Sequence, residues 1–238
     1  MRFATWNLER GGRSRAARLA QEETLKALNA DVLVLTEPAS SYSAGPGVVA
    51  SPATRPGSSH GPESWVAIVG SGIEAMPLDI PYERMSVAAR VAFGSRSLII
   101  YGAVLPWIAV RSHAPELVRE GEMFADVFAR VLEEQKADIQ KLGTGDEIVI
   151  WAGDFNQSVE GLNRGGSRKG RDALNKCISD LGIVAWNGKA AHAVAGMAAI
   201  DLICGPSNSE VRAQGRIDPV RDGVKMSDHA GYWVDLQP

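Results

Sequence analysis

The chain has 238 residues, of which 45% are hydrophobic and 22% are charged. This length and composition exclude a disordered, collagen-like or membrane-spanning chain, and they indicate a folded protein with a sizeable core. The formal net charge of −3 excludes a global basic field that would draw the chain onto nucleic acid. Contact with a polyanion therefore requires a local basic patch or a bound cation.

The predicted elements alternate between strands and helices along the chain. Strands are expected at residues 1–8, 32–35, 65–69, 86–93, 97–104, 147–152, 199–204 and 231–236, with an edge strand at 47–50. Helices are expected at 13–28, 116–142 and 172–181, and a basic polar loop at 164–171. The sequence has no internal repeat and no linker, and hairpin-like neighbours indicate mixed sheets. We therefore expect one α/β domain that spans residues 1–238.

The cysteines and the N-terminus bear on the cellular compartment. Cys177 and Cys204 are too few for a disulfide framework or a zinc cluster, so we expect two free thiols in apolar surroundings. Residues 1–8 form an apolar strand and lack the long hydrophobic core of a signal peptide. These features predict a cytoplasmic protein without membrane insertion.

Acidic, amide and histidine side chains lie at the ends of several distant apolar runs. They are Asn7, Glu9, Glu37, Asp154, Asn156, Asp201, Asp228 and His229. Each one taken alone is typical of a turn. Together, at the ends of buried strands, they would meet at one edge of a sheet, where the carboxylates would raise each other's pKa unless a cation lay between them. Oxygen ligands of this kind suit Mg²⁺, and the pattern therefore predicts a metal-assisted hydrolase.

Five motifs in order carry a resemblance to a known family. They are Trp6-Asn7, Leu35-Thr36-Glu37, Gly153-Asp154-Phe155-Asn156, Ile200-Asp201-Leu202-Ile203 and Ser227-Asp228-His229. This series resembles the endonuclease/exonuclease/phosphatase superfamily, which includes DNase I and exonuclease III-type enzymes. The resemblance implies a four-layer sandwich of two packed, mostly antiparallel sheets flanked by helices. It also implies a phosphoesterase that depends on Mg²⁺ or Mn²⁺.

The resemblance also assigns roles to single residues. Glu37 resembles the principal metal ligand, Asn7 the amide beside it that helps to hold metal or phosphate, and Asp228 a further carboxylate on the metal side. Asp154 resembles the residue that orients or deprotonates the attacking water, and Asn156 one that positions water and phosphate. His229 resembles the histidine that contacts the scissile phosphate, oriented by Asp201. Glu9 stands where an acidic residue that helps to arrange the metal is common.

The sequence departs from the family pattern before the long helix. The family has a histidine or tyrosine at the end of the preceding strand, whereas this chain continues Leu105-Pro106-Trp107. Either His113 folds back into the site from the following loop, or this phosphate contact is missing. Trp107 is a candidate for stacking on a base. Cations and glycine amides in the loop at 164–171 suit phosphates, and the same pattern also fits a solvated loop; the candidates are Arg164, Arg168, Lys169 and Arg171.

The expected activity is hydrolysis of phosphodiester bonds in DNA or RNA by in-line attack of an activated water. One alternative is a small-molecule or lipid-headgroup phosphodiesterase or phosphatase of the same family. Another is a non-catalytic binding module that keeps the fold. The sequence leaves the oligomeric state, the mode of cleavage and the choice between DNA and RNA open.

Overall fold

The computed structural model describes residues 1–10, 14–42, 45–52, 63–71, 74–144, 147–160 and 166–237, apart from the side chains of Phe93 and His113. Two six-stranded sheets form its centre. The first sheet has the order β11 (Val211–Ile217), β14 (Gly231–Leu236), β1 (Arg2–Asn7), β2 (Val32–Thr36), β4 (Val66–Gly70) and β3 (Val48–Ala50). The second has the order β5 (Ala75–Leu78), β6 (Ser86–Phe93), β7 (Arg96–Val104), β8 (Ile148–Asp154), β10 (Asp201–Pro206) and β9 (Ile183–Ala185). A small hairpin pairs β12 (Val220–Arg221) with β13 (Val224–Lys225).

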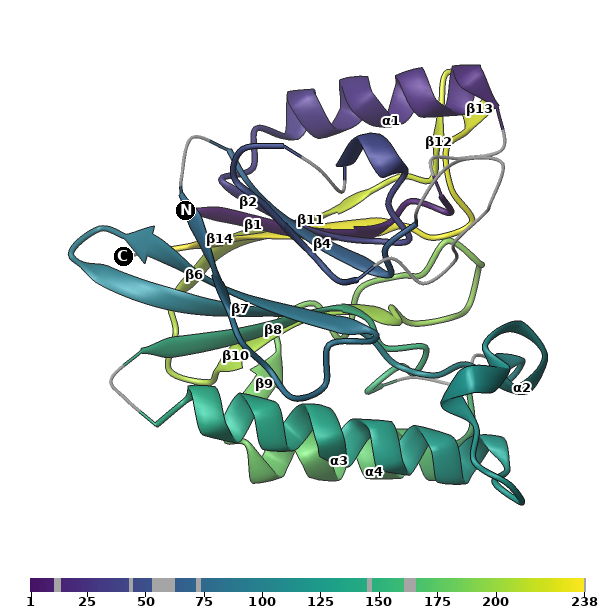
Figure 1. Ribbon diagram of the computed structural model, residues 1–238. Coiled ribbons are helices and arrows are strands. Elements are labelled where there is room, and N and C mark those ends of the chain that lie inside the picture. The colour runs from purple at the N-terminus through teal and green to yellow at the C-terminus, as the bar shows by residue number, and fades with distance from the viewer. Residues whose placement is uncertain are drawn as a thin grey trace.

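Helices cover the outer face of each sheet (Figure 1). Helix α1 (Arg15–Leu28) lies on the first sheet, and α3 (Phe124–Leu142) and α4 (Arg168–Asp180) lie side by side on the second. A short helix α2 (Val110–His113) and two 3₁₀ turns, Ser40–Tyr42 and Pro115–Leu117, complete the helical elements of the described chain. The layers therefore run helix, sheet, sheet, helix, which confirms the four-layer α/β sandwich expected from the sequence.

Each sheet contains one parallel pair of strands within an otherwise antiparallel arrangement. Strand β1 is parallel to β2, and β7 is parallel to β8. The connection within each pair carries a helix, α1 or α3, because parallel neighbours need a long crossover. The sheets approach closely at Gly102 of β7, where a Cβ would lie 2.9 Å from Cγ1 of Val66 in the opposite sheet. The mixed, mostly antiparallel topology is thereby confirmed.

Two helices begin at positions that differ from the sequence prediction. Helix α3 begins at Phe124 and not at residue 116, because Gly121 adopts a φ of +80° and the Met123 amide donates a capping hydrogen bond to Asp126. Helix α4 begins at Arg168 and not at residue 172, because the Ser167 hydroxyl caps its first turn at 2.9 Å from the Gly170 nitrogen. Part of the basic segment predicted as a loop is therefore helical.

The structure also shows the state of the cysteines, of Trp151 and of the apolar helices. Both thiols are buried and free, as expected. Trp151 of β8 is fully buried, so it belongs to the core and has no exposed face for a ligand. In the described parts of the chain, no helix combines the length and the apolar character that crossing a membrane requires.

Candidate active site

The strand pairing brings the polar strand ends to one end of the sandwich. Asn7 ends β1, and the parallel partner β2 ends beside it, one residue before Glu37. Asp154 ends β8, and Asp201 opens the antiparallel neighbour β10 directly opposite it in the register. His229 lies just before β14, which is antiparallel to β1. Asn7 and His229, which are 222 positions apart, thus lie at the same end of the sandwich. They do so because the carboxyl ends of some strands lie beside the amino ends of their antiparallel neighbours.

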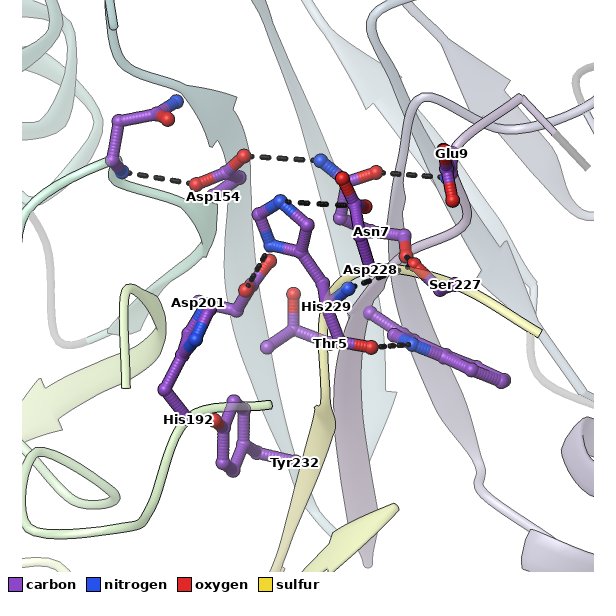
Figure 2. Close-up of polar contacts among 12 residues, drawn as sticks. Thr5, Asn7, Glu9, Asp154, His192, Asp201, Ser227, Asp228, His229 and Tyr232 are labelled. Carbon is purple, nitrogen blue, oxygen red and sulfur yellow. Dashed lines mark hydrogen bonds and ion pairs between the residues drawn. The ribbon is translucent and has the colours of Figure 1, made fainter. Parts of the chain in front are cut away.

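Asp154 links the two sheets through hydrogen bonds. Its Oδ2 accepts a bond of 3.0 Å from the Asn7 side-chain amide, and its Oδ1 accepts a bond of 2.9 Å from the Asn156 backbone amide (Figure 2). The Asn156 side-chain amide donates to the Leu105 carbonyl at 2.9 Å, which ties the end of β8 to the segment that follows β7. Asp154 is 3% exposed. Its carboxylate is therefore fixed in position and nearly removed from water.

The motif around Asp154 has local conformational reasons. Gly153 has a φ of +140°, and a Cβ there would lie 1.9 Å from the Ala103 carbonyl oxygen of the neighbouring strand, so only glycine fits. Phe155 is fully buried and its ring centroid lies 4.5 Å from that of Trp151. Asn156 has a φ of +51°, a conformation that asparagine tolerates better than most residues. The sequence Gly-Asp-Phe-Asn is thus required to turn the chain at the strand end.

Asp201 and His229 form a second hydrogen-bonded pair. Nδ1 of His229 lies 2.7 Å from Oδ2 of Asp201, whose side chain is fully buried (Figure 2). Asp228 lies on the other side of the ring, with its Oδ1 3.9 Å from His229 Nε2. This arrangement fixes the ring plane and leaves Nε2 on the side that faces away from Asp201.

Ser227 anchors the loop that carries His229. Its hydroxyl donates to the Asn7 carbonyl at 2.7 Å and accepts from the His229 backbone amide at 3.1 Å. The Trp6 indole donates to the His229 carbonyl at 3.0 Å. The Ser-Asp-His motif is therefore held on the end of β1, which explains why a serine precedes the two charged residues.

Burial and charge perturb the titration of these groups. Burial and the neighbouring Asp201 raise the pKa of Asp154 to about 7. Burial also raises the pKa of Asp201, and the charge of His229 counteracts this rise. Burial alone would lower the pKa of His229, but the negative charges of Asp201 and Asp154 outweigh it and hold that pKa well above its usual value. The site thus favours the protonated ring of His229, next to a carboxylate, Asp154, whose own pKa is raised.

Glu37 and Glu9 lie at the ends of β2 and β1. Both adopt left-handed backbone conformations, with φ of +45° and +47°. The Glu9 amide donates to the Asn7 side-chain oxygen at 2.9 Å (Figure 2). Glu37 Oε2 lies 3.1 Å from Nε of Arg10, and the charge of Glu37 contributes to the raised pKa of Asp201. Arg10 was not singled out from the sequence, because its partner is 27 residues away.

His192 was also missed by the sequence reasoning, which gave it no role. It lies on the β9–β10 connection, 8% exposed, and its ring meets the His229 ring edge-on with centroids 5.8 Å apart (Figure 2). Its Nδ1 accepts from the Val194 amide at 3.0 Å, so the proton of the neutral ring is on Nε2. Burial and the charge of His229 lower the pKa of His192 to about 4. No local signal in an alanine-rich segment could have found this contact.

The remaining predicted residues lie around this centre or outside the described chain. Trp107 packs against Trp65 with ring centroids 5.4 Å apart and ring planes tilted by 51°. His113 ends α2, and its side chain is outside the described part. Arg164 lies outside the described residues, whereas Arg168, Lys169 and Arg171 lie in the first turn of α4. The Ser167 amide, which precedes that turn, donates a hydrogen bond of 3.1 Å to the side-chain oxygen of Gln157. Gln157 directly follows Asn156, so this bond links the start of α4 to the loop after β8, here called the site loop.

The donors at this end of the sandwich fit a divalent cation. Asp154, Asp201 and His229 each offer one ligand atom, and these atoms lie within 4.8 Å of one another. The second carboxylate oxygen of Asp201 is buried and has no hydrogen-bond partner in the described part of the chain. Such an oxygen is costly unless a cation, a water or a substrate group satisfies it. Carboxylate and amide oxygens are the ligands that Mg²⁺ and Mn²⁺ prefer.

Several solved structures with the same arrangement of elements are described as nucleases. The chain aligns over 99% of its length with 99% of a 3'-5' exonuclease (NExo) from Neisseria meningitidis, at a TM-score of 0.66 and 19% identity. It aligns over 99% of its length with 91% of the APE2 catalytic domain from Xenopus laevis, at a TM-score of 0.68 and 15% identity. An AP endonuclease from Archaeoglobus fulgidus matches over the full length of both chains, at 0.63 and 18%. The chain has the endonuclease/exonuclease/phosphatase fold.

Comparison of the sequence with family models and with curated proteins finds no match. No protein-family model matches the chain, and no curated protein sequence matches it. The fold is therefore recognised from the coordinates, while the sequences are 19% identical or less for the structures named above. These identities establish the fold alone, so the chemistry has to be argued from the site.

Proposed function

We propose that the protein is a divalent-cation-dependent phosphoesterase that hydrolyses phosphodiester bonds, with nucleic acid as the substrate. The observation that carries this proposal is the hydrogen-bonded network that joins Asn7 to Asp154 and Asp201 to His229 at one end of the two sheets. A buried base, a cationic histidine and unsatisfied carboxylate oxygen in one place are the groups that phosphoryl transfer to water requires.

His229 has the position and charge of a phosphate-binding group. Held by Asp201, it presents a cationic ring whose Nε2–H is able to donate to a non-bridging phosphate oxygen. Such preorganised donors stabilise the charge that develops in the transition state. Asp201 acts through His229, since it keeps the ring oriented and protonated.

Asp154 has the position of the group that receives a proton from the attacking water. Its pKa of about 7 suits a base that works near neutral pH, because a much more acidic carboxylate would accept the proton poorly. Asn7 and the Asn156 backbone amide fix the direction of its oxygens. Water held by Asp154 would therefore approach the phosphorus from a constant direction, which favours in-line attack.

A divalent cation completes the site. Glu37, Asp228 and Asn7 would hold it, as the sequence resemblance implies. Asp154, Asp201 and His229 also have ligand atoms within 4.8 Å of one another, but a protonated His229 has no free lone pair for a metal, so these three would act on the reacting groups. When bound, Mg²⁺ or Mn²⁺ supplies Lewis-acid stabilisation of charge on the phosphate oxygens.

Nucleic acid is favoured over small esters by two observations. The first turn of α4 places Arg168, Lys169 and Arg171 on a segment joined to the site loop by Gln157. A structural neighbour with a TM-score of 0.65 and 18% identity is described as a 3' phosphatase, NExo, from Neisseria bound to product DNA hairpin. A small-molecule phosphodiesterase and a non-catalytic binding module are the outcomes that a substrate test must separate from this proposal.

The test is a panel of phosphate esters with Mg²⁺ or Mn²⁺. Circular plasmid, linear duplex, single-stranded DNA, RNA and bis-p-nitrophenyl phosphate are incubated with the wild-type protein and with Asp154→Asn. We expect cleavage of a nucleic acid by the wild type and a loss of about 10²–10⁴-fold in the variant. Cleavage of the small ester alone would contradict the nuclease assignment. No turnover of any ester with either ion would favour the binding module.

A further inference from the structure

Arg10 lies beside Glu37 and has no role in the proposed reaction as described above. Its backbone amide donates to the Glu37 carbonyl at 2.8 Å, and its Nε lies 3.1 Å from Glu37 Oε2. Its Nη1 lies 2.5 Å from Oε2 of Glu63, whose side chain is 9% exposed. Arg10 is thus tied by main chain and side chain to the carboxylate that we expect to be the principal metal ligand.

A buried tryptophan, Trp65, lies next to the Arg10 guanidinium. The Arg10 Cζ atom is 5.5 Å from the centroid of the Trp65 ring, and Trp65 in turn contacts Trp107. The Trp107 ring follows the end of β7 in the second sheet, whereas Arg10 follows the end of β1 in the first. The guanidinium and the two indole rings therefore extend from Glu37 toward the second sheet. They lie on the side of the site where this chain has Leu105-Pro106-Trp107 and the family has a histidine or tyrosine.

The contact between Arg10 and Glu37 is one that a metal would disturb. It joins a single nitrogen to a single oxygen, and not the paired geometry that makes an arginine–carboxylate contact strong. A divalent cation on Glu37 would repel the guanidinium at close range. An arginine in that position gains a new partner when a phosphate ester binds beside the metal, because its planar fork matches two phosphate oxygens.

We propose that Arg10 is a substrate-binding residue whose guanidinium rests on Glu37 and Glu63 in the free protein and contacts a phosphate oxygen when metal and substrate are bound. This inference rests on the proposed function, since it names a further group that holds the same phosphate. It predicts that Arg10 and the cation compete for Glu37, whereas a purely structural Arg10 would hold Glu37 in place and assist the cation.

The test uses binding and not turnover. Mn²⁺ affinity is measured from the electron paramagnetic resonance signal of free Mn²⁺, and the affinity of the Mn²⁺-loaded protein for inorganic phosphate is measured by calorimetry. The variants are Arg10→Gln and Arg10→Lys. Arg2→Ala is the matched control. Arg2 begins β1, whose other end leads to Arg10, and it is ion-paired with Asp235, with its Cζ 4.3 Å from the centroid of the Trp233 ring.

We expect Arg10→Gln to bind Mn²⁺ at least threefold more tightly and phosphate at least tenfold more weakly, with Arg10→Lys between it and the wild type and Arg2→Ala unchanged. Weaker or unchanged Mn²⁺ binding in Arg10→Gln, or unchanged phosphate binding, would overturn the inference. A wild-type protein that binds no Mn²⁺ would contradict the proposed function itself, so the two failures are distinguishable. Circular dichroism and a thermal melt on each variant show that it is folded.

Discussion

Replacement of Asp201 by asparagine removes the charge that keeps His229 protonated while preserving the size of the side chain. Asp201 is fully buried and lies 2.7 Å from His229 Nδ1, so solvent does not screen the pair. Without the carboxylate, the pKa of His229 loses its largest raising cause, and burial, which lowers that pKa, is then opposed by Asp154 and Asp228. The histidine then becomes neutral as the pH rises through a lower pKa than in the wild type.

The expected loss follows from the role of the cation. Removal of one preorganised group that stabilises the transition state typically lowers the rate about 10²–10⁴-fold. This range corresponds to about 3–5 kcal/mol of activation free energy. Because His229 titrates well above its usual pKa in the wild type, activity that depends on the imidazolium should persist above pH 7 there and fall at lower pH in the variant.

The assay combines kinetics with spectroscopy. kcat/KM for the substrate found in the ester panel is measured between pH 5 and pH 9, and the His229 ring is titrated by NMR, which is practical because the chain has four histidines. Asp235→Asn is the control, since Asp235 also accepts hydrogen bonds from a cationic side chain, Arg2, but outside the site. An unchanged His229 pKa, or a kcat/KM within twofold of the wild type across this range, would refute the reasoning.

Two further predictions concern stability. Gly153→Ala should lower the free energy of unfolding by about 3 kcal/mol, because φ is +140° and the new Cβ would overlap the Ala103 carbonyl. The control Gly121→Ala, with a φ of +80° and open space around it, should lower it by about 1 kcal/mol. Equal losses for the two variants in urea unfolding would contradict this prediction. Hydrogen bonds from Arg90 and Ser97 lower the pKa of Glu147 to about 2, so its stabilisation is present above pH 4.5 and is lost as the pH falls toward 2. Glu147→Gln should reduce the stability difference between pH 6 and pH 2 by about 1 kcal/mol or less, since solvent screens this partly exposed pair, and an increased difference would be inconsistent with it.

The meeting of the polar strand ends at one end of the sandwich was predictable because it depends on local signals. An apolar run that ends in a polar residue identifies a strand and its end, and Asn7, Asp154 and Asp201 each follow or open such a run. Strand pairing then brings them together without further information. The motif around Asp154 is equally local, since the positive φ of Gly153 and Asn156 is required by the turn itself.

The contacts of Arg10 and His192 were not predictable because they join positions that no local pattern connects. Arg10 meets Glu37 and Glu63 at separations of 27 and 53 residues. His192 meets His229 only because the β9–β10 connection folds toward the start of β14. The sequence prediction misplaced the starts of α3 and α4 for a different reason. Single capping hydrogen bonds within a polar stretch decide that these helices begin at Phe124 and Arg168.

The position of a bound cation is the observation on which the proposed site depends most. Crystals of the protein grown with millimolar Mn²⁺ are measured at a wavelength where manganese scatters anomalously. We expect an anomalous peak at the end of the sandwich beside Glu37 and Asp228, and we expect this peak to be lost when both residues are replaced by their amides. Crystals in which Mn²⁺ binds elsewhere, or does not bind at this end at all, would contradict this expectation.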